Sequence, residues 1–191
     1  MDDAPARRPP GLAAILAEAQ ARSFAMSCDE RTGSLLATLS ATKPGGRLLE
    51  LGTGVGAGTA WLRAGMHADA QLTTVDVDPA VQAVAIRHLG MDSRITFQCA
   101  DADSWLSSYR GEPFDLAFVD CMPGKFERLD DLIGLLRVGG LYVGDDLLSH
   151  PAWPAAHQQR VDEFIAGLPD VRNLRTTTLA WSTGLVIGAR V

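Results

Sequence analysis

Acidic side chains recur where the short apolar runs of this 191-residue sequence end. The acids at these places are Glu50, Asp76, Asp78, Asp101, Asp103, Asp120, Asp145 and Asp146. An aspartate after a strand often caps the helix that follows, and this use is sufficient for Asp78 and Asp103. Carboxylates crowded into one cleft repel one another, however, unless a cation offsets their charge. If the runs are neighbouring strands, the pattern predicts a crevice suited to a positively charged ligand.

A glycine-rich loop, GTGVGA at residues 52–57, follows the first apolar run. It satisfies the G-x-G-x-x-G/A pattern of dinucleotide-binding loops, and Asp76 lies about where an acid would bind a ribose hydroxyl. A pyrophosphate at this loop would be repelled by Glu50 and the aspartates, because no lysine or arginine stands beside it. S-adenosylmethionine fits better: it carries ribose and adenine with a positive sulfonium and ammonium, and its carboxylate can accept N–H groups at a helix start.

The spacing of apolar residues predicts strands that alternate with helices. The expected strands are 47–52, 72–77, 94–99, 114–120 and 140–146, and the expected helices are 11–26, 30–42, 57–66, 79–89, 102–109, 125–137 and 155–168. Right-handed crossovers between such strands give a parallel sheet with helices on both faces. Residues 172–181 and 183–191 meet at Ser182 and Thr183 without room for a crossover, so we expect an antiparallel hairpin there.

Composition and charge argue against several classes of partner. A net charge of −6 without a cluster of Lys or Arg disfavours nucleic acid, and no apolar segment approaches the roughly 18 residues of a membrane span. The cysteines, Cys28, Cys99 and Cys121, are far apart and suggest neither a disulfide framework nor a zinc site, which fits a reducing cytoplasm. Residues 1–10 lack the apolar core of a secretory signal. We expect them to form a flexible tail before a single domain, 11–191.

Several segments, in order, resemble the motifs of one enzyme family. These segments are LELGTGVG (49–56), TVDVDP (74–79), ADADSWL (100–106), FDLAFVD (114–120) and LLRVGGLYVGDD (135–146). From about Met26 onward the chain resembles the class I S-adenosylmethionine-dependent methyltransferases, and within them the catechol and caffeoyl-CoA O-methyltransferase group. The resemblance implies an α/β, Rossmann-like, doubly wound sheet of about seven strands, mostly parallel with a C-terminal antiparallel hairpin and helices on both faces.

The resemblance also implies a cofactor site. Gly52 and Gly54 would let the backbone approach the methionine part, which Glu50 would help to arrange. Asp76 would accept the ribose hydroxyls and Asp101 would lie near the adenine amino group. The segment 26–33, MSCDERTG, would fold over the methionine part, and the helices within 11–42 would cover the site. The residues implied in cofactor binding are Met26, Ser27, Glu50, Gly52, Thr53, Gly54, Gly58, Thr59, Asp76, Val77, Asp101, Ala102 and Asp120.

A metal site and a catalytic base are implied with two departures from the family pattern. Asp120, Asp145 and Asp146 match the positions that hold Mg²⁺ against two acceptor oxygens in metal-dependent members, and carboxylates suit Mg²⁺ or Ca²⁺. Asp146, however, replaces an asparagine. Where the family often has a basic lysine, this sequence has Pro123, with Lys125 two residues later. Lys125 and His150 are therefore the candidate bases, with His157 as a further one.

The resemblance, together with the three aspartates, implies O-methylation of a small hydroxylated acceptor, such as a catechol or phenol, assisted by a divalent metal. Three alternatives stay open: a metal-independent small-molecule methyltransferase, an NAD-dependent oxidoreductase, and a non-catalytic cofactor-binding protein. A homodimer is also left open, because the family is often dimeric. Of the tryptophans, Trp61 and Trp105 are expected in the core and Trp153 near the acceptor. Trp181 is expected either to line the pocket or to pack against the hairpin.

Overall fold

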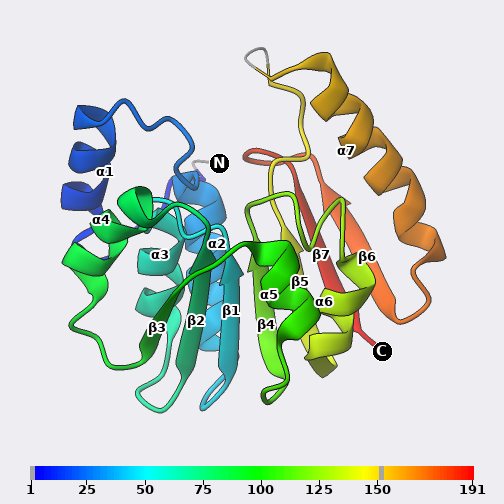
Figure 1. Ribbon diagram of the computed structural model, residues 1–191, viewed down its shortest axis with the longest axis horizontal. Helices are drawn as coiled ribbons and strands as arrows, with labels where there is room; N and C mark the ends of the chain where they lie inside the picture. The colour runs from blue at the N-terminus through cyan, green and yellow to red at the C-terminus, as the bar shows by residue number, and fades with distance from the viewer. Residues whose placement is uncertain (1–2, 151–152) are drawn as a thin grey trace.

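The protein is built around one sheet, seen in a computed structural model that describes residues 3–150 and 153–191 (Figure 1). Within these residues seven strands pair, namely β1 (Arg47–Leu51), β2 (Gln71–Asp76), β3 (Ile95–Cys99), β4 (Phe114–Val119), β5 (Leu136–Gly144), β6 (Leu174–Leu179) and β7 (Leu185–Arg190). The α-helices are α1 (Leu12–Ala21), α2 (Glu30–Ala41), α3 (Ala57–Gly65), α4 (Pro79–Leu89), α5 (Ala102–Ser108), α6 (Leu129–Leu135) and α7 (Ala155–Gly167), and a 3-10 turn, η1 (Leu168–Asp170), follows α7.

The strand order, β3-β2-β1-β4-β5-β7-β6, confirms the doubly wound fold. Strands β1 to β5 are parallel, whereas β7 runs antiparallel to both β5 and β6. The chain leaves β1 in one direction to build β2 and β3, then returns to build β4 on the other side. The order of the strands therefore reverses between β1 and β4, where open α/β sheets form a ligand crevice.

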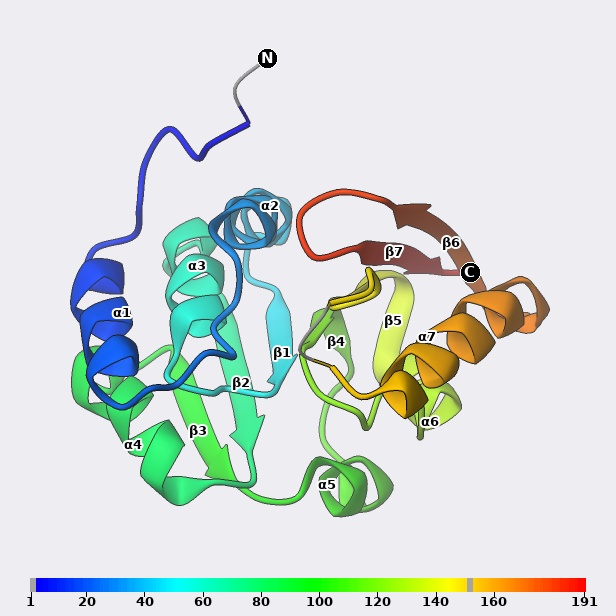
Figure 2. The ribbon, with the colours of Figure 1, turned by 90° about the horizontal axis from the view of Figure 1, so that it is seen from above.

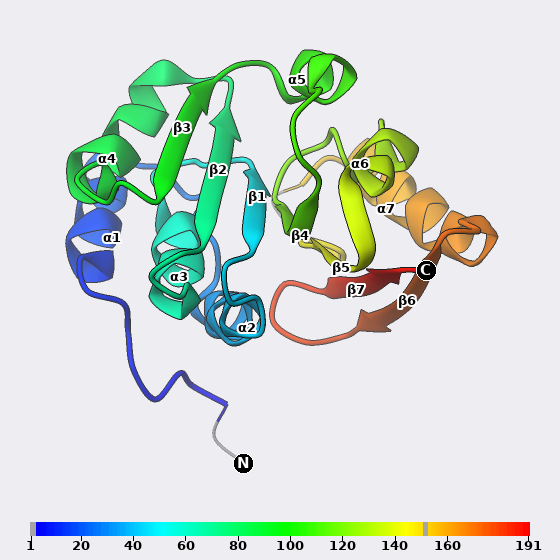
Figure 3. The same ribbon diagram turned by 90° about the horizontal axis from the view of Figure 1, so that it is seen from below.

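Alternate side chains of the strands belong to two separate cores, because successive residues of a strand point to opposite faces. Leu48, Leu72 and Leu116 pack in one core with α1, α2, α3 and α4. Leu49, Val75 and Ala117 pack in the other with α5, α6 and α7. Figures 2 and 3 show α2 and α3 on one side of the sheet and α5 and α6 on the other. The sheet is thus covered on both faces, as the apolar pattern predicts.

Several element boundaries differ from the expected ones. The predicted helix 125–137 begins only at Leu129, because Pro123 and Gly124 precede it in a turn and both Gly124 and Arg128 have positive φ. Strand β5 begins at Leu136 rather than residue 140, since Gly139 bends the strand at φ 79° without ending it. Helix α1 ends at Ala21 instead of residue 26, and Ser23 then adopts a left-handed φ of 55°. The chain from Phe24 onward is consequently free to cross the sheet edge.

The N-terminal residues within the described range contact the body of the domain. Asp3 lies 3.1 Å from Arg31 and accepts a hydrogen bond from the Trp181 indole, and Arg8 pairs with Glu30 on helix α2. The first two residues of the expected tail lie outside the described ranges, and the flexibility of residues 1–10 stays a prediction. Across residues 3–150 and 153–191, helices that combine enough length and apolar character to cross a bilayer are absent.

Candidate active site

A cavity of about 400 Å³ lies at the carboxyl ends of β1 and β2. Its walls are the glycine loop after β1, the residues after β2, and the segment that joins α1 to α2. The residues from the predicted cofactor site that line it are Met26, Ser27, Gly52, Thr53, Gly54, Gly58, Asp76, Val77 and Asp120. The connection between the two N-terminal helices, rather than the helices themselves, therefore faces this cavity. The helices pack on α3 and α4 instead.

The glycine loop needs glycine for two different reasons. Gly52 has a φ of 97°, and a β-carbon there would lie 2.6 Å from the Asp120 carbonyl oxygen, so any side chain would force β1 and β4 apart. Gly54 has a φ of 52°, and its N–H donates to Asp76 at 2.7 Å. Helix α3 then starts at Ala57 with no side-chain cap. Its first N–H groups thus point toward the cavity, where a carboxylate can accept them.

Asp76 is oriented by the backbone on both sides. One oxygen accepts from Gly54 N–H, and the other accepts from Asp78 N–H at 2.8 Å. Each carboxylate oxygen has two lone pairs, so both oxygens can accept a further donor from the cavity. The prediction that Asp78 caps a helix is confirmed, because its side chain accepts from Ala80 and Val81 at the start of α4. The two oriented oxygens of Asp76 therefore suit recognition of a pair of hydroxyl groups.

Glu50 lies beneath the loop rather than in the cavity. It is fully buried, and one of its oxygens accepts from Thr59 at 2.5 Å and from Thr74 at 2.6 Å. Thr74 also contacts Thr53 at 2.6 Å, and Thr53 in turn accepts from the Gln82 amide at 3.1 Å. Burial raises the pKa of Glu50 to about 7, although the two hydroxyl donors oppose the shift. The predicted residues Glu50 and Thr59 therefore hold the loop from below.

Two members of this network were not predicted from the sequence. Thr74 sits in an apolar strand and Gln82 in an apolar helix face, and both are almost fully buried. The available signal was a polar residue placed where the helix or strand period requires an apolar one. Such residues are usually buried only when they are hydrogen-bonded, so each of them indicates a buried polar network.

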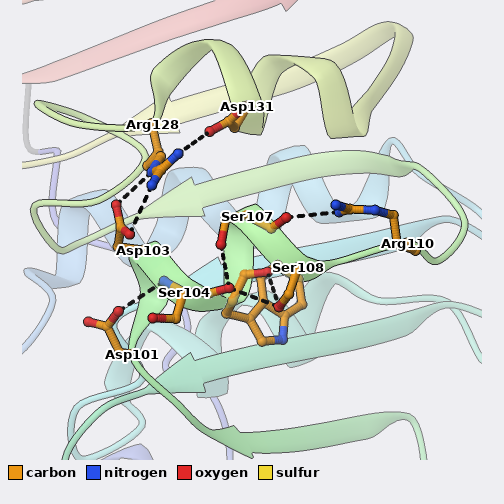
Figure 4. A network of polar contacts seen from close by, with 9 residues as sticks. Asp101, Asp103, Ser104, Ser107, Ser108, Arg110, Arg128 and Asp131 are labelled. Atoms are coloured by element: carbon orange, nitrogen blue, oxygen red, sulfur yellow. Dashed lines mark hydrogen bonds and ion pairs between the residues drawn. The ribbon is translucent and has the colours of Figure 1, made fainter.

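The end of the site assigned to adenine is less enclosed. Asp101 caps helix α5 by accepting from Ser104 N–H at 2.9 Å, and the neighbouring Asp103 pairs with Arg128 at 2.7 Å (Figure 4). Asp103, which was expected to cap α5, is therefore not its N-cap; it lies in the first turn, where a negative charge favours the positive end of the helix. Neither Asp101 nor Ala102 lines the cavity found beside the glycine loop. Their contact with adenine stays a prediction.

A second cavity, of about 590 Å³, adjoins the first at the carboxyl ends of β4 and β5. The two share Met26, Ser27 and Cys28 from the connecting segment, and Asp120 and Cys121 from the end of β4. Lys125 and His150, the predicted bases, both line the second cavity, as do Asp145 and Asp146. The structure therefore brings the predicted cofactor residues and the predicted catalytic residues to either side of one common wall.

Asp120, Asp145 and Asp146 form an acidic triad in this second cavity. One oxygen of each lies within 4.8 Å of the others. Burial raises the pKa of all three carboxyl groups, that of Asp145 to about 6, and the charge of Asp145 raises the pKa of Asp120 further. Asp146 has a φ of 63°, a left-handed conformation that Asn and Asp tolerate better than other side chains. Carboxylate oxygens this close, with Asp145 buried and Asp120 and Asp146 half-buried, are suited to share a divalent cation that would offset their charge.

Lys125 supplies a positive charge next to this acidic triad. Its side chain is 4% exposed, and its ammonium donates to the backbone oxygen of Asp145 at 2.7 Å. The charge of Lys125 lowers the pKa of Asp120, Asp145 and Asp146 against the effect of burial. The turn after β4 thus returns Lys125 to the site although its place in the sequence differs from the family pattern.

Aromatic side chains form the outer wall of the second cavity. The Trp153 ring lies 4.4 Å from His157 and 5.8 Å from His150, centroid to centroid, and Phe126 meets His157 edge-on at 5.5 Å. Burial lowers the pKa of His157, which favours its neutral form. His150 and Trp153 belong to the loop before α7, which also contains residues 151–152, outside the described ranges. The wall offers flat, apolar surfaces beside the carboxylates.

The other tryptophans do not contribute to either cavity. Trp61 is 3% exposed and packs in the core with α2 and α4, as predicted. Trp105 is half-buried and stacks on Tyr109 at a centroid distance of 4.7 Å at the margin of the other core. The Trp181 indole N–H donates to Asp3 at 2.9 Å, so this residue faces the N-terminal segment.

Comparison with known protein sequences places this geometry in a wider context. A family model described as "Methyltransferase domain" matches residues 49–147. A relative from Mycobacterium avium that bears the name "Putative O-methyltransferase" is 34% identical over 139 residues, which cover 68% of this chain and 62% of that relative. The chain therefore spans less than two thirds of the length of the curated relative.

Solved structures with the same fold cover nearly the whole chain. The O-methyltransferase TomG from Streptomyces achromogenes, in complex with SAM, has a TM-score of 0.84 and 22% identity over 97% of this chain and 91% of its own. The SAH-bound methyltransferase PaMTH1 from Podospora anserina has a TM-score of 0.81 and 21% identity over 96% of this chain and 88% of its own. At this level of identity the agreement is one of fold.

Proposed function

The chain belongs to the methyltransferase domain family, and we propose that it transfers the methyl group of S-adenosylmethionine to an oxygen atom of a small acceptor. The observation that carries this proposal is the pair of cavities that meet at Met26–Cys28 and Asp120–Cys121. One cavity has the glycine loop and an oriented carboxylate, and the other has a triad of carboxylates with a buried lysine. A donor and an acceptor bound in them would face each other across a single wall.

Residues of the first cavity would hold the cofactor. Asp76 would accept the ribose hydroxyls, and the N–H groups at the start of α3 would receive the methionine carboxylate. Met26 and Val77 are 76% and 67% exposed, an unusual state for apolar side chains beside a cavity, and a bound adenosyl group would cover them. The bound cofactor supplies an activated methyl group, and the chain positions it toward the second cavity.

Residues of the second cavity would hold and deprotonate the acceptor. Its volume of about 590 Å³ and its aromatic wall favour a small, flat molecule such as a catechol or phenol. The three clustered carboxylates fit Mg²⁺ or Ca²⁺, because their oxygens are the ligands these ions prefer and their crowding around the buried Asp145 calls for a compensating cation. Such an ion, when bound, would lower the pKa of an acceptor hydroxyl. His150, or Lys125 in its neutral amine form, would then receive the proton.

A metal-independent reaction is the second candidate, and a specific contact favours it. Lys125 already places a positive charge beside the triad and is fixed there by its bond to the Asp145 carbonyl oxygen. This ammonium would stabilise an ionised acceptor oxygen without any metal. We also propose that the protein is cytoplasmic and does not bind nucleic acid. A homodimer is the assembly to test.

Calorimetric titration of S-adenosylmethionine into the purified protein, with NAD as the parallel ligand, is the first test. We expect S-adenosylmethionine to bind and NAD not to bind, because the acidic crevice repels a pyrophosphate. Binding of NAD alone would overturn the proposal in favour of an oxidoreductase. Transfer of labelled methyl groups to catechols and phenols, with Mg²⁺ present or chelated, then separates the metal-dependent from the metal-independent reaction. Cofactor binding without transfer would favour a non-catalytic protein.

A further inference from the structure

The turn between β6 and β7 touches both halves of the proposed site. Ser182 and Thr183 line the second cavity, and each makes a side-chain hydrogen bond to a different part of it. The turn is itself anchored to the chain after β5, because Leu147 N–H donates to Gly184 O and Leu148 N–H donates to Thr183 O. Two adjacent hydroxyl groups are therefore presented from one firmly attached support.

Ser182 reaches the segment that covers the cofactor cavity. Its hydroxyl lies 2.6 Å from Asp29 Oδ1 and 2.9 Å from the hydroxyl of Thr32. A hydroxyl has one proton, and the carboxylate can only accept, so Ser182 donates to Asp29 and receives its other bond from Thr32. Thr32 is fully buried in helix α2, so its bond to Ser182 is shielded from solvent.

Asp29 ends the cover segment, residues 24–29, and is also the N-cap of helix α2. At the other end of the segment Phe24 N–H donates to Ala19 O. Between them, the described structure gives residues 25–28 no backbone hydrogen bond to any other element. The cover segment is thus hydrogen-bonded at its two ends, while Phe24 and Cys28 pack against the core. Its side-chain hydrogen bond to the β6–β7 turn runs from Ser182 to Asp29.

Thr183 acts on the acidic triad instead. Its hydroxyl donates to Asp145 Oδ1, which also accepts from Asp146 N–H at 2.7 Å. Both donors are aimed at the same oxygen, so the orientation of the Asp145 carboxylate is fixed and Oδ2 is left for the cavity. Asp145 is 2% exposed, so these two donors act on it out of contact with bulk solvent.

We propose that this turn is a positioning element in which Ser182 holds the cover segment over the cofactor and Thr183 aims the Asp145 carboxylate at the acceptor. The inference rests on the proposed function, because it assigns roles relative to cofactor and acceptor. The two residues are adjacent on one support, so the turn sets the spacing between the cofactor cover and the acceptor carboxylate. It follows that the two hydroxyls should control different kinetic constants.

The test compares Ser182→Ala and Thr183→Val, with Thr178→Val as the matched control. Thr178 lies exposed on strand β6 of the same hairpin and lines neither cavity. Calorimetry with S-adenosylmethionine, without acceptor, should show binding weakened about tenfold in S182A, the loss typical of one hydrogen bond to a charged group. Binding should stay within about twofold of wild type in T183V and T178V. In methyl-transfer assays kcat should fall in T183V, whereas S182A should mainly raise KM for S-adenosylmethionine.

Amide hydrogen exchange separates positioning from simple loss of structure. In S182A the amides of residues 25–29 should exchange faster while those of β6 and β7 keep their wild-type rates. A double-mutant cycle with Asp29→Ala should show that S182A adds little once Asp29 is gone. Faster exchange throughout the hairpin, or unchanged cofactor affinity in S182A, would overturn the inference. Failure of the wild-type protein to bind S-adenosylmethionine would instead overturn the proposed function, so the two failures are distinguishable.

Discussion

Glu50 provides a quantitative prediction about stability and pH. Its side chain is fully buried, and the pKa of about 7 in the folded protein lies above the ordinary value of 4.5. The raised pKa means that the fold favours the protonated carboxyl group. The contribution of Glu50 to stability is therefore fully present below about pH 4.5 and is lost as the pH rises through about 7. The gap between the two pKa values corresponds to about 3 kcal/mol.

Replacing Glu50 with Gln should remove this pH dependence. Gln is neutral at every pH, and its carbonyl oxygen can still accept from Thr59 and Thr74. The free energy of unfolding of E50Q minus that of wild type should therefore increase by about 3 kcal/mol between pH 4.5 and pH 8. The difference between the two proteins is the quantity to use, because the other buried carboxyl groups change stability with pH in both of them.

Urea denaturation of both proteins at several pH values measures this difference directly. Equal m-values would show that the two proteins expose the same surface on unfolding. The expected curve rises between about pH 4.5 and 7 and is flat above that range. A difference that does not change with pH would refute the reasoning, because it would mean that Glu50 has the same pKa folded and unfolded. Glu50 would then be solvated or paired in a way that the buried network does not allow.

Three further predictions concern the loop, the core and the triad. Gln82→Leu removes the amide that donates to Thr53 and to Gln98 O at 3.1 Å each, and urea denaturation should show a loss of about 2 kcal/mol; an unchanged midpoint would contradict the network. Trp61→Ala should destabilise the protein by about 3 to 5 kcal/mol, measured in the same way, because the ring is 3% exposed; a loss below about 1 kcal/mol would contradict its core position. Asp145→Ala should reduce Mg²⁺-stimulated methyl transfer at least about tenfold while cofactor binding by calorimetry stays unchanged. Equal loss with and without chelator would argue against a metal role.

The topology of the protein could be predicted from its sequence because apolar residues recur with the period of a strand or of a helix in each layer. Leu48 and Leu49 point to opposite cores, and this alternation along with the helical spacing between strands is enough to define a sheet covered on both faces. The acids at strand ends could likewise be assigned to one edge, because parallel strands bring their carboxyl ends together. The predicted boundaries of strands and helices were wrong where a glycine can either bend an element or end it. Gly139 bends strand β5 but does not end it, and only the neighbouring strands decide between these outcomes.

The candidate site was predictable where a motif stands at a strand end, and not where distant segments meet. Ser182 and Thr183 were interpreted only as the turn of a hairpin, because their contacts to Asp29 and Asp145 depend on how β7 adds to the sheet. Gln82 was likewise missed, since its partner Thr53 lies on another element. Lys125 was identified, but its approach to Asp145 depends on the turn after β4, which was expected to be helical. Contacts of this kind require the three-dimensional arrangement.

The wall shared by the two cavities separates the two parts of the proposed site. The glycine loop and the residues after β2 line the cavity proposed for the cofactor, while the residues after β4, β5 and β6, together with residues 25–29, line the other. Among the described residues only Met26–Cys28 and Asp120–Cys121 line both cavities, so substitutions at His150, Trp153 or His157 should alter the proposed acceptor site with little effect on the proposed cofactor site. New acceptor specificity is therefore best sought by randomising the loop before α7 while the first half of the chain is kept constant.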